Sequence, residues 1–217
     1  MTDMSRRPTR LCFVRHGETP WNAERRIQGH EDVGLNDEGH AQARAAARGL
    51  EGEYFSALYS SDLRRARETA EALSPPLGLP IRLEPGLRER HYGVFQGLTV
   101  EEMEHRYPEA GRRYHARDPE FDFGHGESLN TFAARIEATV TRLAARHAGE
   151  CAVIVTHGGV LDILYRRATG RDLVGPRDFP IPNAGLNWIE IGADGSWRLD
   201  VWADRRHLDA TLEEFLR

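Results

Sequence analysis

Short apolar runs alternate with longer amphipathic segments along most of the chain, which is typical of alternating strands and helices. Continuous apolar runs indicate strands buried on both faces, and we expect such strands at residues 11–14, 57–60, 81–83 and 151–155. Residues 185–191 and 197–203 instead alternate around a turn, which predicts a late strand pair. The pattern therefore predicts an α/β fold with a mostly parallel central sheet flanked by helices.

Helices are expected between these strands. Residues 36–50 begin with Asn36, which can cap a helix, and continue with acidic residues and then alanines and arginines. Residues 61–73 carry apolar side chains at spacings of three and four, and the Ser-Pro-Pro sequence at 74–76 and the Gly-Leu-Pro sequence at 78–80 are expected to break that helix. A long helix over about 128–147 and a shorter one over 160–169 complete the set.

Residues 84–127 show a weaker pattern and are richer in glycine, proline and aromatic residues. Within them, Thr99 and Glu102 have the spacing of a capping box, which predicts the start of a helix. The sequence contains no internal repeat and no low-complexity linker that would divide it. We therefore expect a single domain over residues 1–217, with a small inserted cap region over about 93–125.

Composition narrows the classes of partner. The 217 residues carry 29 basic and 34 acidic side chains, and because lysine is absent all the basic ones are arginine. A net charge of −5 argues against a nucleic-acid binder, whereas a local group of arginines could still bind a small anion. No apolar run reaches the ~20 residues of a membrane span, and the run at 11–14 is too short for a signal peptide. The expected location is the cytoplasm.

Charged groups and imidazoles follow several of the predicted strands, at the edge where parallel sheets bind ligands. His16 stands beside Arg15 directly after the first strand, and His157 follows the strand at 151–155. Arg65 lies at a strand-to-helix junction, where free backbone N–H groups favour an anion. Glu89 comes after the third strand. We expect these four junctions to converge at one edge of the sheet.

The chemistry of His16 has two interpretations. A neutral imidazole with one nitrogen tied to a backbone carbonyl presents the other as a nucleophile, and imidazole can form a covalent intermediate. A single Arg-His-Gly sequence is a weak signal, because a loop histidine is more often a surface or core residue. The second histidine and the arginines at neighbouring junctions favour the functional interpretation.

Taken in order, the motifs resemble those of the histidine phosphatase superfamily, the phosphoglycerate mutase-like proteins. They are Arg-His-Gly-Glu-Thr at 15–19, Pro-Trp-Asn at 20–22, Arg-Ile-Gln-Gly-His at 26–30, Leu-Asn at 35–36 with Gly39, the segment 61–70, the segment 89–97, Gly-Glu-Ser at 126–128 and Thr-His-Gly-Gly at 156–159. Together they cover nearly the whole chain.

This resemblance implies a role for each matching residue. His16 would be the nucleophile that becomes phosphorylated, and Glu89 would donate a proton to the leaving oxygen. The phosphoryl group would be surrounded by Arg15, Arg65 and His157. Further substrate contacts would be Asn22, Gln28, Gly29, Arg90, Tyr92 and Gly158. The family uses no metal, and we expect no cofactor. His16 must be neutral to attack, whereas His157 is expected to act as a cation with the help of the phosphate itself.

Two activities of the family compete. The Glu-Arg-His-Tyr-Gly sequence at 89–93 looks like the mutase version. Three features favour a phosphatase: a short cap, Gly159 where mutases usually carry asparagine, and a chain that stops at Arg217. The cap matters because a mutase must keep water from the phosphohistidine, which a short cap makes harder. We expect hydrolysis of a small phosphorylated metabolite, with a mutase and a non-catalytic phospho-ligand sensor as alternatives. The natural substrate and the oligomeric state stay open, a homodimer being one outcome.

Overall fold

The computed structural model describes residues 7–209, and within them six strands form one sheet. The strands are β1 (Thr9–Arg15), β2 (Ala57–Ser60), β3 (Ile81–Leu83), β4 (Cys151–Thr156), β5 (Leu186–Ile191) and β6 (Trp197–Asp204). Their order is β3-β2-β4-β1-β5-β6, with the first four parallel and the last two antiparallel to their neighbours. The predicted mostly parallel sheet and the late strand pair are confirmed.

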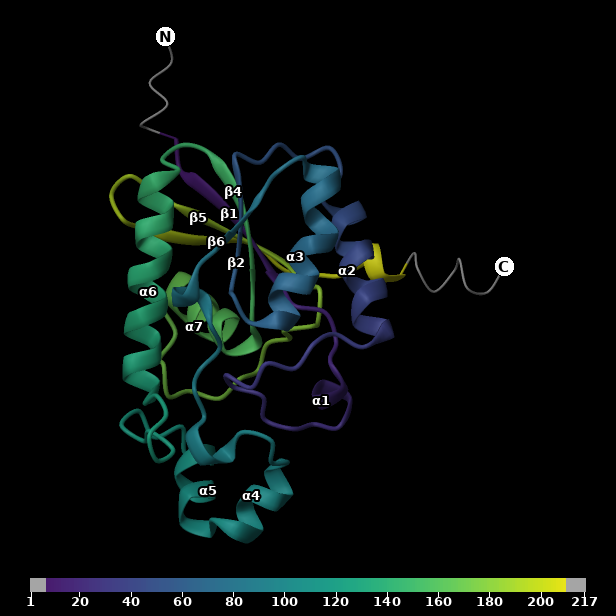
Figure 1. The fold of residues 1–217 in the computed structure, drawn as a ribbon. Helices are drawn as coiled ribbons and strands as arrows, with labels where there is room; N and C mark the ends of the chain where they lie inside the picture. Colours follow the sequence, from purple (N-terminus) through teal and green to yellow (C-terminus); the bar gives the residue numbers. More distant parts are fainter. Residues whose placement is uncertain (1–6, 210–217) are drawn as a thin grey trace.

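Helices cover both faces of this sheet. They are α1 (Pro20–Ala23), α2 (Asp37–Gly49), α3 (Arg64–Leu77), α4 (Val100–Arg106), α5 (Pro108–His115), α6 (Leu129–Arg146) and α7 (Gly158–Thr169), with short 3-10 turns η2 (Pro85–Leu87) and η3 (Gly93–Phe95). Helices α2 and α3 lie on one face, and α6 and α7 lie on the other (Figure 1). Asn36 caps α2 as predicted, since its side chain accepts the N–H of Gly39.

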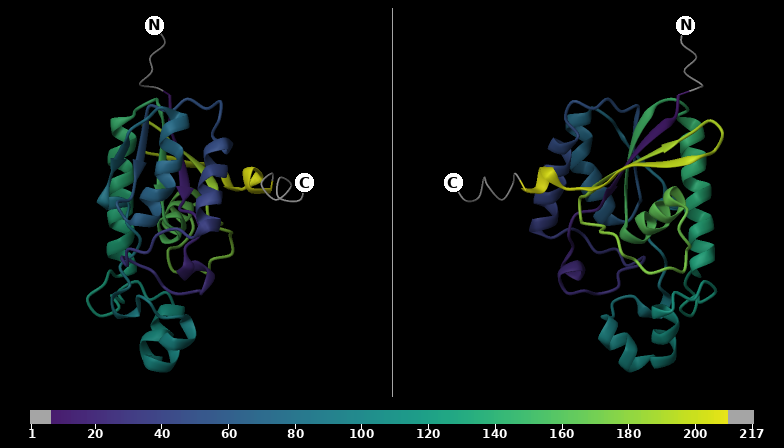
Figure 2. Two further views of the ribbon diagram at one scale, coloured as in Figure 1. Left: turned by 45° about the vertical axis from the view of Figure 1, so that its right-hand side comes forward. Right: turned by 180° about the vertical axis from the view of Figure 1, so that it is seen from behind.

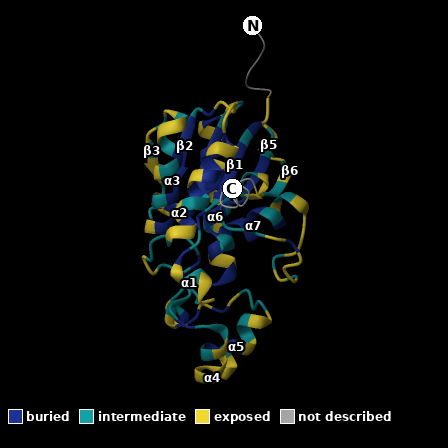
Figure 3. Cartoon of the chain, turned by 90° about the vertical axis from the view of Figure 1, so that its right-hand side faces the viewer, coloured by how far each residue is buried: buried dark blue, intermediate teal, exposed yellow. Residues whose placement is uncertain are grey.

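The core consists of two apolar layers, one on each face of the sheet. Along β1, Leu11 and Phe13 pack toward α6 and α7, whereas Cys12 and Val14 pack toward α2 and α3. All four side chains are fully buried. Because side chains alternate between the two faces of a strand, burial on both faces explains the continuous apolar run (Figure 3).

The expected end of helix α3 was wrong. Pro75 and Pro76 lie inside its last turn, and the helix ends at Leu77. A proline removes a backbone donor, but its carbonyl can still accept a hydrogen bond. Gly78 adopts a left-handed conformation (φ 64°), and its N–H donates to the carbonyls of Ser74 and Pro75. The turn is therefore closed by the glycine that follows the prolines.

Residues 84–127 build a small helical lobe at one end of the molecule. Thr99 and Glu102 form the predicted capping box at the start of α4, and α5 follows directly, a helix that the pattern did not predict. Phe95, Met103 and Phe123 belong to a separate apolar cluster of this lobe. Helices α4 and α5 lie at the end of the sheet opposite the described N-terminus, where β1 and β4 end (Figures 1 and 2).

The structure also bears on the membrane prediction. Within residues 7–209, no helix combines the length and the apolar character that crossing a membrane requires. The predictions that concern the two ends of the chain are not covered, because residues 1–6, before the apolar run at 11–14, and Arg217 lie outside the described residues.

Candidate active site

His16 directly follows β1 and is held rigidly. Its backbone N–H donates to the carbonyl of Thr156 at 2.9 Å, and its own carbonyl accepts from the Asn183 side-chain amide at 2.9 Å. The ring Nδ1 lies 2.7 Å from the carbonyl of Gly17. Because a carbonyl can only accept, Nδ1 carries the proton and Nε2 keeps its lone pair. The ring is thus oriented as a nucleophile requires.

The segment after His16 lies against the first turn of helix α2. A Cβ atom on Gly17 would overlap the backbone carbonyl of Gly39, and one on Gly39 would overlap the carbonyl of Glu18. The N–H of Gly17 donates to Thr69 Oγ1 on α3 at 3.0 Å. This close approach explains why both positions are glycine, and it fixes the loop that carries His16.

Two arginines lie beside His16, the buried Arg65 and the half-buried Arg15. Arg65 donates from Nη2 to the carbonyl of Gly29 at 2.8 Å and from Nη1 to that of Glu31 at 2.9 Å. Arg15 donates from Nη1 to the carbonyl of Ile181 at 2.5 Å. Burial lowers the pKa of each guanidinium to about 10, so both stay charged at neutral pH. Loop carbonyls therefore hold two fixed cations in place.

His157 packs against His16, with ring centroids 5.2 Å apart. Its Nε2 lies 2.8 Å from Ser61 Oγ, a hydroxyl that the sequence did not single out. Burial, and then the nearby Arg65, lower the pKa of both histidines well below the ordinary value. His16 is neutral, as expected, but so is His157. A cationic His157 stays a prediction that depends, as expected, on a bound phosphate raising its pKa.

Four buried polar atoms of this region have no hydrogen-bond partner in the described part of the chain. They are Arg15 Nε, Arg65 Nε, His157 Nδ1 and Gln28 Oε1. An unpartnered buried polar group costs about 1–3 kcal/mol, so a cluster of them indicates a ligand that supplies the partners. The arginine Nε atoms are donors, and the Gln28 amide can present its NH₂ instead by rotating 180°. The ligand they fit is rich in acceptor oxygens.

A cavity of about 240 Å³ brings most of the predicted site residues together. Those that line it are Arg15, His16, Asn22, Gln28, Gly29, Arg65, Glu89, Tyr92 and Gly158. His157 lies against the ring of His16 rather than on the cavity wall, and Arg90 lines a neighbouring cavity. We call the 240 Å³ cavity the phosphate pocket.

Several lining residues were missed at the sequence level. They are Arg26, Ile27, Tyr114, Gly159 and Arg177. Gly159 belongs to the Thr-His-Gly-Gly motif at 156–159, but at the sequence level it marks phosphatases against mutases and is not a predicted site residue. Tyr114 comes from α5, and Arg177 comes from the irregular loop before β5, where no periodicity predicts which side chains face inward.

Glu89 reaches this pocket from the loop after η2. Its Oε2 accepts the N–H of Gly159 at 2.8 Å, and its Oε1 accepts the N–H of Arg90 at 2.8 Å. A Cβ atom on Gly159 would overlap Oε1. The carboxyl group is therefore seated against the first turn of α7, close to the groups that surround His16.

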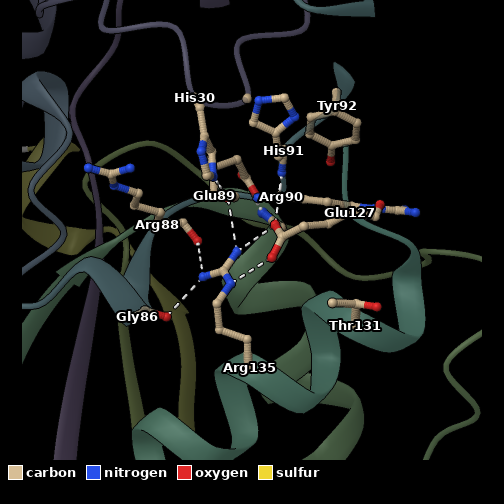
Figure 4. Close-up of polar contacts among 12 residues, drawn as sticks. His30, Gly86, Arg88, Glu89, Arg90, His91, Tyr92, Glu127, Thr131 and Arg135 are labelled. Carbon is tan, nitrogen blue, oxygen red and sulfur yellow. Dashed lines mark hydrogen bonds and ion pairs between the residues drawn. The ribbon is translucent and has the colours of Figure 1, made fainter. Parts of the chain in front are cut away.

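An ion pair holds the loop that carries Glu89 (Figure 4). Arg135 of α6 donates from Nε and Nη2 to the two carboxylate oxygens of Glu127, both at 2.7 Å. The same guanidinium donates to the backbone carbonyls of Gly86, Arg88 and Glu89 at 2.9–3.2 Å. Glu127 in turn accepts the N–H of His91 at 3.0 Å. The loop is fixed on both sides of Glu89.

Comparison with known sequences agrees with this geometry. The model of the histidine phosphatase superfamily (branch 1) matches residues 11–205. Phosphoglycerate mutase-like protein 4 of Arabidopsis thaliana is 42% identical, covering 93% of this chain and 87% of the relative. Metal-independent phosphoserine phosphatase of the same plant is 38% identical, covering 93% of this chain and 84% of the relative.

Solved structures show the same relationship. A mycobacterial glucosyl-3-phosphoglycerate phosphatase superimposes with a TM-score of 0.80 at 33% identity, covering 92% of this chain and 100% of that one. Phosphoserine phosphatase of Entamoeba histolytica, in complex with 3-phosphoglyceric acid, gives a TM-score of 0.82 at 25% identity, covering 92% and 99% of the two chains. With its family model, its relatives and its paired histidines in agreement, the chain belongs to the histidine phosphatase superfamily.

Proposed function

We propose that this protein is a phosphomonoesterase that hydrolyses a small phosphorylated metabolite through a phosphohistidine on His16. The observation that carries the proposal is the free Nε2 of a neutral His16 beside the buried, unpartnered Nε atoms of Arg15 and Arg65. Relatives named as phosphatases of phosphoserine and of glucosyl-3-phosphoglycerate support this activity over that of a mutase.

In the first step, Nε2 of His16 attacks phosphorus while the bond between phosphorus and the leaving oxygen breaks. Negative charge spreads over the three equatorial oxygens, where fixed donors contribute most of the catalysis. Arg15, Arg65 and His157 would supply those donors. Glu89, as the carboxylic acid, would give its proton to the leaving oxygen, which departs as an alcohol.

The second step returns His16 to its starting state. A water molecule attacks the phosphohistidine, and the carboxylate of Glu89 takes a proton from that water. The bond between nitrogen and phosphorus breaks, inorganic phosphate leaves, and Nε2 regains its lone pair. One carboxyl group thus serves as acid and then as base.

The other predicted contacts complete this proposal. Asn22, Gln28, Gly29 and Gly158 would bind the phosphoryl group, since they line the phosphate pocket. Arg90 and Tyr92 would bind the rest of the substrate. Residues of about 93–125 would form the cap of a single domain. A cytoplasmic location and a homodimer stay predictions from the sequence.

The test is phosphate release by purified protein from a broad panel of small phosphoesters in the presence of EDTA. Among residues 7–209, no group of three or more His, Cys, Asp or Glu side chains could hold a metal ion, and we expect EDTA to leave the rate unchanged. Rapid alkaline quenching should trap phosphate on the protein, and subsequent acid treatment should release it.

Two variants sharpen this test. His16→Ala should abolish both turnover and the trapped phosphate, whereas the matched change His40→Ala, at an exposed position of α2, should preserve both. Failure of the wild-type protein to release phosphate from any ester of the panel would contradict the proposal. Interconversion of the two monophosphoglycerates, dependent on glycerate 2,3-bisphosphate, would identify a mutase instead, the activity that the Arabidopsis mutase-like relative and the sequence at 89–93 favour.

A further inference from the structure

A second cavity of about 380 Å³ adjoins the phosphate pocket. Tyr92, Tyr114, Gly159 and Arg177 line both cavities, so the two lie side by side. A substrate whose phosphoryl group lies at His16 therefore has room for its leaving group in this adjoining cavity. We call the second cavity the leaving-group cavity.

The leaving-group cavity carries a surplus of positive charge. Arg90, Arg117 and Arg177 line it, and Asp162 is the one acidic residue among its lining residues. Asp162 is buried and already pairs with Arg117 at 2.6 Å and with the buried Arg166 at 3.3 Å. Its contact with Arg177 is longer, at 3.4 Å. One carboxylate cannot balance this group of guanidinium ions.

Two of these arginines, Arg166 and Arg117, also hold the backbone of a nearby loop through hydrogen bonds. Arg166 donates to the carbonyls of Asp172 and Pro176, at 2.6 and 3.0 Å, and so holds the loop on which Arg177 lies. Arg117 donates to the carbonyl of Leu173 at 3.1–3.2 Å.

Arg177 differs from them. Among the described residues it donates no hydrogen bond to a carbonyl, and its side chain is 46% exposed. Its single ion pair leaves most of the five guanidinium N–H donors unused. A cation that lines two adjoining cavities and lacks strong partners is suited to a ligand anion.

Arg90 provides a second cation in this cavity. Its Nε and Nη2 donate to the carbonyls of Glu127 and Phe121, both at 2.9 Å. Its guanidinium also lies 4.4 Å from the ring centre of Phe123. These contacts fix Arg90 in a mostly buried position, where its charge is weakly screened.

We infer that the leaving-group cavity binds an anion: the preferred substrate is a phosphomonoester whose alcohol carries a second anionic group, a carboxylate or another phosphate, held by Arg177 with support from Arg90. This inference rests on the proposed function of the phosphate pocket. Binding energy from a remote anion would orient the phosphoryl group toward His16 and raise the rate of transfer.

The loop before β5 links the two ends of such a substrate. Arg15 donates to the carbonyl of Ile181, and Asn183 donates to the carbonyl of His16. Arg177 lies on the same loop, a few residues earlier. The distance between the nucleophile and the anion-binding arginine is therefore set by one anchored segment, which would select leaving groups by length as well as by charge.

The experiment compares matched pairs of substrates that differ by the anion. These pairs are O-phosphoserine with O-phosphoethanolamine, 3-phosphoglycerate with glycerol 3-phosphate, and fructose 1,6-bisphosphate with fructose 6-phosphate. We expect kcat/KM to favour the more anionic member of at least one pair by about tenfold or more, as hydrogen bonds to charged groups usually allow. The pair that responds tells whether a carboxylate or a phosphate is bound.

A variant pair then assigns the effect to Arg177. Arg177→Met should reduce the ratio of kcat/KM values within the responding substrate pair toward one. Arg171→Met is the matched control, because Arg171 is an arginine of the same loop that pairs with Asp178 and lines neither cavity. Its ratio should equal that of the wild-type protein. A ratio that Arg177→Met leaves unchanged would overturn the inference.

The readouts keep this inference separate from the proposed function. If the protein hydrolyses p-nitrophenyl phosphate but the kcat/KM ratios are near one for all three pairs, the proposed phosphatase activity stands and the anion subsite is overturned. If the wild-type protein hydrolyses no ester, the proposed function fails. Calorimetric binding of the same pairs to His16→Ala then decides on the subsite, since equal dissociation constants overturn it and a preference for the anionic member supports it.

Discussion

The carboxylate of Glu89 lies directly against the backbone of Gly159, whose N–H donates to Oε2 at 2.8 Å. The other oxygen, Oε1, occupies the space that a Cβ atom at position 159 would need. The first turn of α7 therefore positions the group proposed to transfer protons, while the residue before that helix is His157. The start of one helix therefore positions both the proposed acid–base group and a histidine proposed to bind phosphate.

Gly159→Ala should slow the release of poor leaving groups. The added methyl group must displace Glu89, and a positioned general acid contributes about 10²–10⁴-fold to such reactions. We expect kcat for alkyl phosphates to fall by about 10²-fold, and phosphoenzyme formation from p-nitrophenyl phosphate to fall less, because p-nitrophenolate departs without a proton. Rapid-quench kinetics on both substrates would measure the two effects.

Gly111→Ala is the control for that change. It adds the same methyl group in helix α5, where the nearest atom, Glu104 Cγ, lies at an ordinary 3.4 Å. Its kinetics should match those of the wild-type protein. If Gly159→Ala retained full activity toward alkyl esters, the seating of Glu89 against α7 would not matter for proton transfer.

Arg135 should act on the rate without touching the substrate. Arg135→Met removes the pair with Glu127 and the donors to the carbonyls around Glu89 (Figure 4). We expect kcat to fall by about tenfold or more through misplacement of Glu89, and the free energy of unfolding to fall by about 1–3 kcal/mol. The dissociation constant of inorganic phosphate should stay within about twofold, because Arg135 does not line the phosphate pocket.

Arg142→Met is the matched control on the same helix. Arg142 forms one exposed ion pair with Glu84 at 2.8 Å, and such pairs contribute little. Its kcat and its unfolding midpoint in urea should stay close to those of the wild-type protein. Loss of phosphate binding in Arg135→Met, in parallel with kcat, would show a general collapse of the site rather than a positioning role.

Arg65→Lys should weaken anion binding although it keeps the charge. A lysine ammonium cannot hold the carbonyls of Gly29 and Glu31 and also present a donor in the direction of Nε. We expect the dissociation constants of phosphate and vanadate, measured by calorimetry, to rise about 10–100-fold. Arg64→Lys changes the preceding arginine, which is exposed and pairs with Glu68, and should bind as the wild-type protein does. Equal affinities in the two variants would contradict the role of Arg65.

The parts of the molecule that the sequence predicts well depend on short-range or repeating patterns. Continuous apolar runs identify the four parallel strands, and the residues after them fix where His16, Arg65 and His157 must converge. The loop before β5 has no such period, so the approach of Arg177 to Asp162 depends on tertiary packing alone. Helix α3 shows a different error, because it continues through Pro75 and Pro76 and ends only before Gly78, the second of the two predicted breaks.

Burial of two neutral histidines should make the protein less stable in mild acid. Burial and the nearby Arg65 lower the pKa of His16 and of His157 in the folded state, whereas an unfolded histidine takes up a proton near pH ~6.5. Below that pH, and above the lowered folded values, the unfolded state binds more protons than the native state does. The contribution of the two histidines to the free energy of unfolding is therefore complete above pH ~6.5. Below that pH the free energy of unfolding falls by about 1.4 kcal/mol per pH unit for each histidine. Urea unfolding between about pH 7.5 and pH 5 would measure this slope. His16→Asn and His157→Asn should each reduce it by about one proton, and an unchanged slope in both variants would show that the buried rings are protonated in the folded protein.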